Sequence, residues 1–128
     1  LCKSLLLNEG TRHIEEGFYV SPDNILGRLL NKRKPRGLIG SNMSFSRKAI
    51  EDLNGFDEDF ILPAIGEDAD LNWRFRAAGY QFRSVRNLAI QYHLFHKENW
   101  KDQSENAALM ELKIAKNEFR CKNGLKKM

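Results

Sequence analysis

Residues 65–75 read IGEDADLNWRF and carry three carboxylates, one glycine and the start of a helical pattern. Leu71, Phe75 and Ala78 follow the spacing i, i+4 and i+7, which places apolar side chains on one face of a helix. We therefore predict a helix over 67–78, ended by the glycine that follows it. The other elements are predicted on either side of this helix.

The carboxylates of Glu67, Asp68 and Asp70 have two interpretations. Unpaired N–H groups and the helix dipole favour negative charge at a helix start by about 0.3–1 kcal/mol per charge. A carboxylate at the edge of a cleft can also accept a proton from a sugar hydroxyl as that oxygen attacks. Both interpretations stand at this point.

Two short helices are predicted before the carboxylates. The first covers 25–31 and is capped by Asp23 or Asn24, and the second covers 47–54 and is capped by Ser46. The extended or alternating runs 37–45, 80–85 and 88–94 predict strands. The last helix is predicted over 104–121, with a stop at Gly124 and an apolar face of Ala108, Leu112, Ala115 and Phe119. These elements indicate a mixed α/β fold with few strands and flanking helices.

The chain has 128 residues, 41% hydrophobic and 30% charged, which suits one soluble globular domain. No run approaches the roughly 18 apolar residues that a membrane-spanning helix needs. The chain opens with LCKS, without a signal-peptide pattern, and we expect it to be part of a longer protein. Cys2 and Cys121 lack the C-x-x-C spacing of a zinc or redox site and are expected to be unpaired thiols in a reducing cytoplasm.

The net charge of +4 is unevenly distributed. Residues 28–48 contain seven basic side chains and no acid, whereas 51–70 contain eight acids and no base. Such runs usually form solvated faces. A basic block beside an acidic block also suits a site that holds a polyanion and a cation together. No known nucleic-acid-binding motif is present, so we expect no nucleic-acid partner.

His93 and His96 lie three residues apart after a predicted strand. A single histidine in such a place is more often a structural hydrogen-bonding residue than a ligand. Two histidines near a carboxylate cluster make a metal site an equal alternative. A divalent ion bound with a diphosphate would need further oxygen ligands.

Four motifs together resemble the C-terminal half of a family 2 glycosyltransferase of GT-A fold. They are GSNMSFSR (40–47), NGFDEDF (54–60), GEDADL with RF (66–75) and YHLFH (92–96), in that order. The resemblance is to the galactosyltransferase-like group, which includes β-1,4-galactosyltransferases and bacterial enzymes that make surface polysaccharide and lipopolysaccharide. It implies a catalytic region over 37–97, preceded by a helical or irregular lead-in (1–36) and followed by a C-terminal amphipathic helix (98–128).

The resemblance implies a role for each motif residue. Asp68 would be the general base that deprotonates the acceptor hydroxyl, and Glu67 and Asp70 would bind the acceptor sugar. His96 would be a metal ligand, with His93 as a second one. The donor side would be lined by Gly40, Ser41 and Asn42. The implied reaction is inverting transfer of a sugar from a nucleoside diphosphate sugar to a glycan or lipid-linked acceptor, with Mn²⁺ or Mg²⁺ neutralising the diphosphate.

Two features depart from the family pattern. ILPAI at 61–65 stands where relatives often have an aromatic, glycine-rich run that stacks on the acceptor, so the acceptor is not carried over. The family's nucleotide-binding half and its D-x-D metal motif precede the matched region, and this chain contains neither. The D-A-D at 68–70 lies inside the helix start and is not interpreted as that motif. We therefore expect this chain alone to bind donor weakly and to lack turnover.

Two other functions stand beside the transferase. The replaced run at 61–65 suits a non-catalytic glycan- or partner-binding module derived from a transferase. The basic segment 28–48 and the last helix suit an adaptor for anionic lipid or nucleic acid. For the transferase we expect a cytoplasmic protein whose basic segment could rest on the inner face of the membrane, although ordinary solubility explains the charge equally well.

Overall fold

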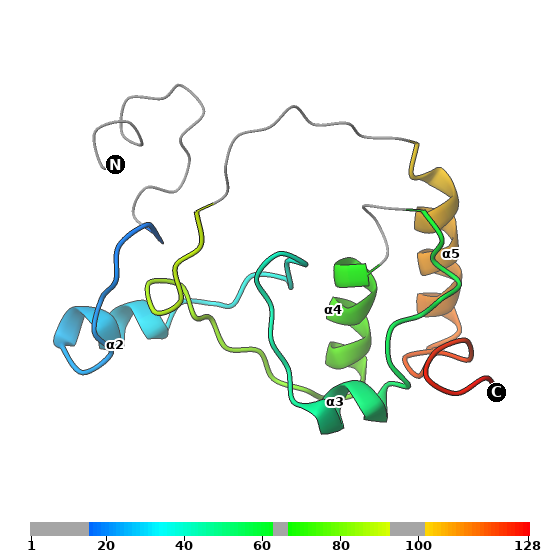
Figure 1. Cartoon of the computed structure of the whole chain (residues 1–128), viewed down its shortest axis with the longest axis horizontal. Helices are drawn as coiled ribbons and strands as arrows, with labels where there is room; N and C mark the ends of the chain where they lie inside the picture. The colour runs from blue at the N-terminus through cyan, green and yellow to red at the C-terminus, as the bar shows by residue number, and fades with distance from the viewer. Residues whose placement is uncertain (1–15, 63–66, 93–101) are drawn as a thin grey trace. The chain divides into compact units, whose positions relative to one another are not determined.

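The computed structural model describes residues 16–62, 67–92 and 102–128 and shows four helices in these ranges. They are α2 (Ile25–Asn31), α3 (Arg47–Asp52), α4 (Glu67–Ala77) and α5 (Ser104–Ala115), drawn in Figure 1. None of the helices in these ranges is long and apolar enough to cross a membrane. The helices of the described chain are therefore short elements that must be stabilised by their surroundings.

The chain divides into two compact units. Unit 1 comprises Leu1–Arg36 and Arg83–Glu98, and unit 2 comprises Gly37–Phe82 and Asn99–Met128. Unit 1 holds α2, and unit 2 holds α3, α4 and α5. The expected catalytic region was 37–97, and its last part, from Arg83 onward, thus belongs to the same unit as the expected lead-in, 1–36.

In unit 1, α2 begins at Asn24, whose side-chain oxygen accepts a hydrogen bond from the Gly27 amide at 2.6 Å. This satisfies one of the amides that every helix start leaves unpaired. The bounds of this helix and its cap are confirmed as predicted. The helix contacts the preceding turn through Gly27, where a Cβ would lie 1.9 Å from the carbonyl oxygen of Ser21.

Asn87 ties residues 83–92 to both sides of α2. Its φ of 64° lies in the left-handed region, which asparagine tolerates better than most residues. Its side chain donates to the Phe18 carbonyl at 2.8 Å and accepts from the Arg33 guanidinium. Its own carbonyl accepts from the Val20 amide at 2.9 Å. The segments before and after α2 are therefore anchored to the same residue.

The three helices of unit 2 end in the same way, with a left-handed residue just beyond the last turn. These residues are Asn54 (φ 68°) after α3, Gly79 (φ 83°) after α4 and Asn117 (φ 53°) after α5. The next amide along the chain then donates to a carbonyl five residues earlier: Gly55 to Ile50 at 2.8 Å, Tyr80 to Phe75 at 2.9 Å and Glu118 to Lys113 at 3.0 Å. The end predicted for α4 is confirmed within one residue, whereas the helix predicted over 104–121 is wrong beyond 115 because Asn117 terminates it.

The buried face of α5 also differs from the predicted face. Asn106 and Lys113 are buried, whereas the side chains expected to face the core are exposed, namely Ala108, Leu112 and Ala115. Phe119 lies beyond the helix and packs against the core from an irregular segment. The helical period was predicted correctly, and the side that faces inward was not.

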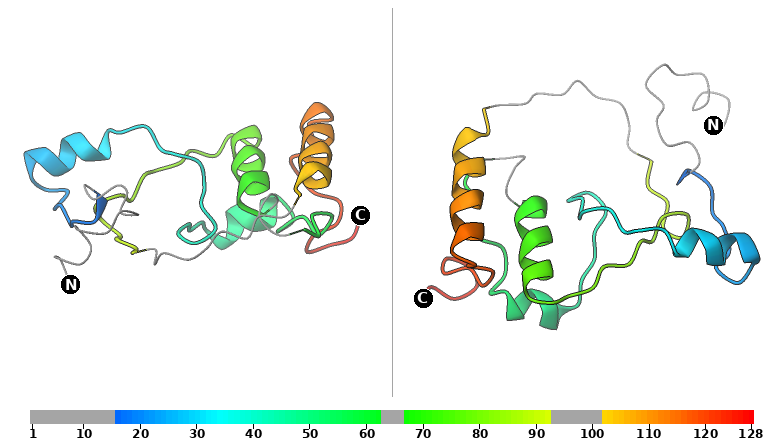
Figure 2. Two further views of the ribbon diagram at one scale, coloured as in Figure 1. Left: turned by 90° about the horizontal axis from the view of Figure 1, so that it is seen from above. Right: turned by 180° about the vertical axis from the view of Figure 1, so that it is seen from behind.

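The apolar core of unit 2 lies between α3 and α4. Ala49, Leu53, Leu71 and Phe75 form it, and each is at most 5% exposed. The ring of Phe75 makes an edge contact with Tyr80, with centroids 5.5 Å apart. This confirms the inward face predicted for α4. The two longer helices, α4 and α5, lie side by side in both views of Figure 2.

Among the residues that the structure describes, no segments pair as β-strands, and one isolated antiparallel bridge joins Asn123 and Lys127. The predicted strands over 37–45, 80–85 and the described part of 88–94 are therefore wrong for this structure. A strand needs a neighbour to bond its N–H and C=O groups. The first amides of 37–45 bond to side chains of α4 instead. The GT-A fold itself stays a prediction.

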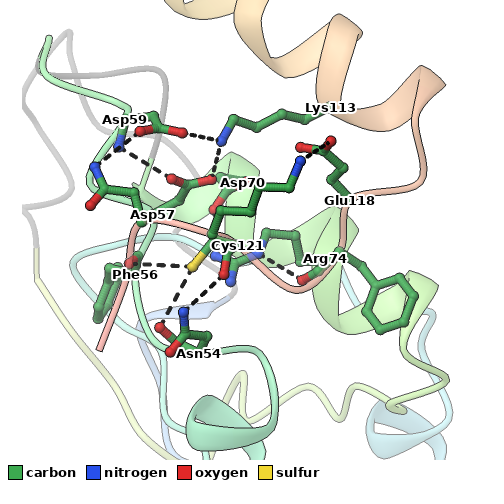
Figure 3. A network of polar contacts seen from close by, with 12 residues as sticks. Asn54, Phe56, Asp57, Asp59, Asp70, Arg74, Lys113, Glu118 and Cys121 are labelled. Atoms are coloured by element: carbon green, nitrogen blue, oxygen red, sulfur yellow. Dashed lines mark hydrogen bonds and ion pairs between the residues drawn. The ribbon is translucent and has the colours of Figure 1, made fainter. Parts of the chain in front are cut away.

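Arg74 is fully buried and connects α4 to the rest of unit 2 (Figure 3). Its guanidinium donates to Asp70 at 2.7 Å, to the carbonyls of Leu53 and Gly55, and to the carbonyl of Phe119 at 2.9 Å. The Leu53 carbonyl belongs to the residue that caps the C-terminal end of α3, and the Gly55 carbonyl follows two residues later. The negative end of the helix dipole favours a cation there. These bonds replace the water that the buried guanidinium has lost. They fix α4, and the carboxylates at its start, against the end of α3 and the segment after α5.

A second buried cation, Lys113 of α5, lies between two carboxylates (Figure 3). Its Nζ is 2.6 Å from Asp57 and 2.6 Å from Asp59. Burial by itself lowers the pKa of Lys113, but the hydrogen bonds to the two carboxylates outweigh it and raise that pKa. The hydrogen bond from Lys113 lowers the pKa of Asp59. This cluster turns Lys113 inward and explains the rotation of α5 relative to the predicted face.

We expect the Lys113–Asp59 pair to make folding stability depend on pH at both ends of the range. Asp59 has a lowered pKa in the folded chain, so its contribution is present above about pH 4 and is lost as the pH falls through the folded value. Lys113 has a raised pKa, so its contribution is present below about pH 10 and is lost as the pH rises through the folded value.

Urea denaturation of Asp59→Asn tests this dependence. The variant should be less stable than the unchanged chain at neutral pH, and the difference should shrink below about pH 4. Asp23→Asn, which changes an exposed acid in unit 1, is the control and should have little effect at either pH. A stability difference for Asp59→Asn that stays constant down to pH 3 would contradict the role of this pair.

Candidate functional site

The start of α4 and the segment 37–42 lie against each other. The Gly40 amide donates to Asp68 Oδ2 at 3.0 Å, and the Leu38 amide donates to Asn72 Oδ1 at 3.3 Å. Asp68 and Asn72 are four residues apart, so their side chains share one face of α4. The amides of Leu38 and Gly40 therefore both face this side of the helix. Two motifs that are 28 residues apart in sequence, the predicted donor glycine and the predicted base, therefore meet.

A tight turn places Gly40 at the edge of this contact. The Asn42 amide donates to the carbonyl three residues earlier at 2.9 Å, and the side chains of Ser41 and Asn42 are exposed. A Cβ added to Gly40 would lie 3.8 Å from Asp68 Oδ2 and 3.9 Å from Glu67 Oε1, which are ordinary contacts. The φ of Gly40 lies outside the left-handed region. The fold by itself therefore accepts a side chain at this position.

The three carboxylates at the start of α4 separate into two groups. Glu67 is exposed and Asp68 is half-buried, and both lie beside Gly40. Asp70 is only 1% exposed, and its Oδ2 accepts from Arg74 at 2.7 Å. Burial raises the pKa of Asp70, against the lowering effect of Arg74. The structure gives Asp70 a structural role, and its binding of the acceptor stays a prediction.

The predicted metal ligands, His93 and His96, lie outside the described residues. Over 16–62, 67–92 and 102–128, no group of three or more His, Cys, Asp or Glu side chains is placed to hold a metal ion.

Cys2 also lies outside these ranges, whereas Cys121 is buried and unpaired as predicted. Burial raises the pKa of the Cys121 thiol, which keeps it protonated at neutral pH.

Asn72 is the residue at this site that the sequence did not single out. It lies one turn beyond Asp68 and accepts a hydrogen bond from the Leu38 amide, in the segment that leads into the Gly40 turn. Its spacing from Asp68 was a usable signal, because residues four apart on a helix share a face. The missing information was that 37–40 runs along α4 and not along a neighbouring strand.

We expect Asn72→Ala to loosen the 37–40 segment while leaving the core intact. One side-chain hydrogen bond of this kind contributes about 0.5–1.5 kcal/mol. Asn72→Asp keeps an oxygen acceptor at the same place and is the matched control. The amides of Leu38 and Gly40, followed by hydrogen exchange in NMR spectra, should exchange faster in Asn72→Ala than in Asn72→Asp. Equal exchange rates in the two variants would show that Asn72 does not hold the segment.

A comparison with protein families finds a match over residues 28–97 to the family described as the N-terminal domain of galactosyltransferase. The matched range covers more than half of the chain and includes Gly40, Asp68 and Asn72. No curated protein matches the chain, and no solved structure does. The family match and the meeting of Gly40 with Asp68 concern the same residues. The chain therefore belongs to the galactosyltransferase N-terminal domain family and is a glycosyltransferase-like domain.

Proposed function

We propose that this chain supplies the general base and part of the donor and acceptor sites of an inverting glycosyltransferase. The enzyme would move a sugar from a nucleoside diphosphate sugar to a glycan or lipid-linked acceptor. The family match supports a general glycosyltransferase role. The observation that carries the finer proposal is the 3.0 Å hydrogen bond between the Gly40 amide and Asp68, because it joins the expected donor side to the expected base.

In this proposal Asp68 takes a proton from the acceptor hydroxyl as the hydroxyl oxygen attacks the anomeric carbon. A new carbon–oxygen bond forms on one face of the sugar, and the bond to the diphosphate breaks on the other face, with the electron pair leaving on the diphosphate. The Gly40 amide holds Oδ2 of Asp68 and so orients the carboxylate. Glu67, exposed beside it, would accept hydrogen bonds from acceptor hydroxyls.

The donor side of the proposal rests on the turn at Gly40. Since the fold leaves room for a Cβ at this position, a requirement for glycine there would come from a ligand that approaches the backbone closely. A nucleotide sugar is such a ligand in this family. Ser41 and Asn42 present exposed polar side chains next to that backbone and would bind donor oxygens.

We also propose that His96, with His93, holds a divalent ion that supplies charge neutralisation at the diphosphate. Both histidines lie outside the described residues, so the roles given above to Glu67, Asp68 and the Gly40–Asn42 turn are argued without the ion. The family description names an N-terminal domain, whereas we propose, from the resemblance of the motifs, that the chain corresponds to the C-terminal half of a GT-A fold. In that placement another part of the enzyme supplies the nucleotide-binding half and D-x-D.

A second candidate function, a non-catalytic glycan- or partner-binding module derived from a transferase, is favoured by one observation. Ile61, at the start of the run that replaces an aromatic acceptor platform, is 81% exposed. An aliphatic side chain cannot stack on the acceptor sugar as an aromatic ring does, which weakens the case for transfer to such an acceptor and leaves an exposed apolar side chain for another partner. Glycan binding by the full enzyme, without release of nucleoside diphosphate from any of a panel of nucleotide sugars, would select this candidate.

Two substitutions at Asp68 in the full enzyme separate chemistry from positioning. Asp68→Asn keeps an oxygen that can accept from the Gly40 amide but removes the base, so transfer should fall by about 100-fold or more with donor binding little changed. Asp68→Ala also loses the Gly40 contact and should weaken donor binding as well.

The readouts are release of nucleoside diphosphate and calorimetric binding of the donor. Glu111→Gln, which neutralises an exposed acid on α5, is the control and should leave both unchanged. An Asp68→Asn enzyme that transfers sugar within a few-fold of the unchanged rate would remove Asp68 from the role of base.

A further inference from the structure

The apolar stripe of α2 faces solvent. Ile25 is 79% exposed, Leu26 57% and Leu29 59%. A helix of a soluble protein normally turns such a stripe toward its core. Here the packed side of the helix is the glycine side, since a Cβ on Gly27 would lie 1.9 Å from the Ser21 carbonyl oxygen. This backbone contact leaves the apolar side outward.

The flank of the stripe is basic. Arg28 and Lys32 are exposed and lie three residues after Ile25 and Leu29, respectively, which places them on the same side of the helix as the apolar side chains. In the parts of unit 1 that the structure describes, neither cation has an ion-pair partner. The face therefore combines three apolar side chains with two unneutralised positive charges.

The surroundings of α2 strengthen this charge. Residues 16–36 and 83–92 contain seven basic side chains and two acids. Of the two acids, Glu16 is already bound by Arg36 at 3.0 Å and by Arg86 at 2.9 Å. The segment just before α2 adds exposed aromatic side chains, Phe18 and Tyr19. The Tyr19 ring, with its polar hydroxyl, favours the boundary between apolar and aqueous phases, and the Phe18 ring adds apolar surface.

We propose that this face of α2 docks on an anionic lipid surface. Ile25, Leu26 and Leu29 enter the headgroup region, and Arg28 and Lys32 contact lipid phosphates. Charge complementarity selects an anionic surface, and the apolar stripe beside the cations gives a lipid surface an advantage over a purely polar polyanion. A two-turn helix with three inserted side chains gives reversible, salt-sensitive binding. The inference concerns unit 1 alone and does not depend on sugar transfer.

Vesicle flotation of the full chain tests the charged part of the proposal. Vesicles of phosphatidylcholine with one quarter phosphatidylglycerol should carry the chain at low salt and release it at high salt, and pure phosphatidylcholine should carry little. Arg28→Gln/Lys32→Gln should weaken binding about 5-fold per residue, or roughly 25-fold together. Lys116→Gln/Lys126→Gln, which removes two exposed lysines of unit 2, is the matched control and should bind as before.

The apolar part is tested with Ile25→Ser/Leu29→Ser against Ile61→Ser/Leu112→Ser, which changes exposed apolar side chains of unit 2. The first pair should abolish flotation and the second should not, with circular dichroism showing that both remain folded. Equal binding to neutral and anionic vesicles, or equal behaviour of α2 variants and controls, would overturn the proposal. So would a dimer in sedimentation that is lost in Ile25→Ser/Leu29→Ser, because the face would then belong to a second copy of the chain.

Discussion

The guanidinium of Arg74 lies in the interior of unit 2 and bonds to carbonyls at the end of α3 and after α5. A buried charge is stable only when its hydrogen-bonding groups are satisfied, so these segments must come together around it. The fully buried apolar cluster of unit 2 has four residues, too few to specify the arrangement alone. Asn54 adds to the polar framework by donating to the carbonyls of Cys121 and Lys126, both at 2.8 Å.

This framework explains how one helix can serve both stability and chemistry. α4 turns Asp70 inward to Arg74, while Asp68, in the same first turn but on another side of the helix, binds the Gly40 amide. Because both side chains start from the same rigid helix, fixing Arg74 also fixes the position of Asp68. The exposed Glu67 then completes a pair of carboxylates beside the turn. A single helix start thus separates carboxylates that look equivalent in the sequence.

Much of the helical structure could be predicted from local signals. The cap at Asn24, the cap at Ser46 and the stop at Gly79 depend only on neighbouring residues, and the structure has all three. Over the described residues the predicted strands are wrong, because pairing depends on a neighbouring segment, which alternation within one segment does not reveal. The prediction of which face of α5 points inward was wrong, because two carboxylates far away in the sequence bind Lys113 in the interior. Local apolar spacing contains no information about such a partner.

The candidate site was predictable only in part, because some of its contacts depend on segments far away in the sequence. Motif order predicted that Gly40 and Asp68 serve one site; the structure brings them into contact, and their roles stay predictions. Asn72 required knowledge of which segment lies along α4, and the inward position of Asp70 required knowledge of Arg74 and its carbonyl partners. The outward stripe of α2 was visible as a pattern, but its exposure follows from the backbone contact at Gly27.

The most direct measurement compares the unfolding free energies of Arg74→Met and Arg76→Met by urea denaturation. Arg76 is exposed on the same helix and lies over the Phe82 ring, with 4.5 Å from its guanidinium carbon to the ring centroid. We expect Arg74→Met to lower the free energy of unfolding by about 3–5 kcal/mol, because it leaves Asp70 and buried carbonyls without their hydrogen-bond donor. Arg76→Met should lower it by no more than about 1 kcal/mol. Equal losses in the two variants would contradict the account that the buried guanidinium organises unit 2.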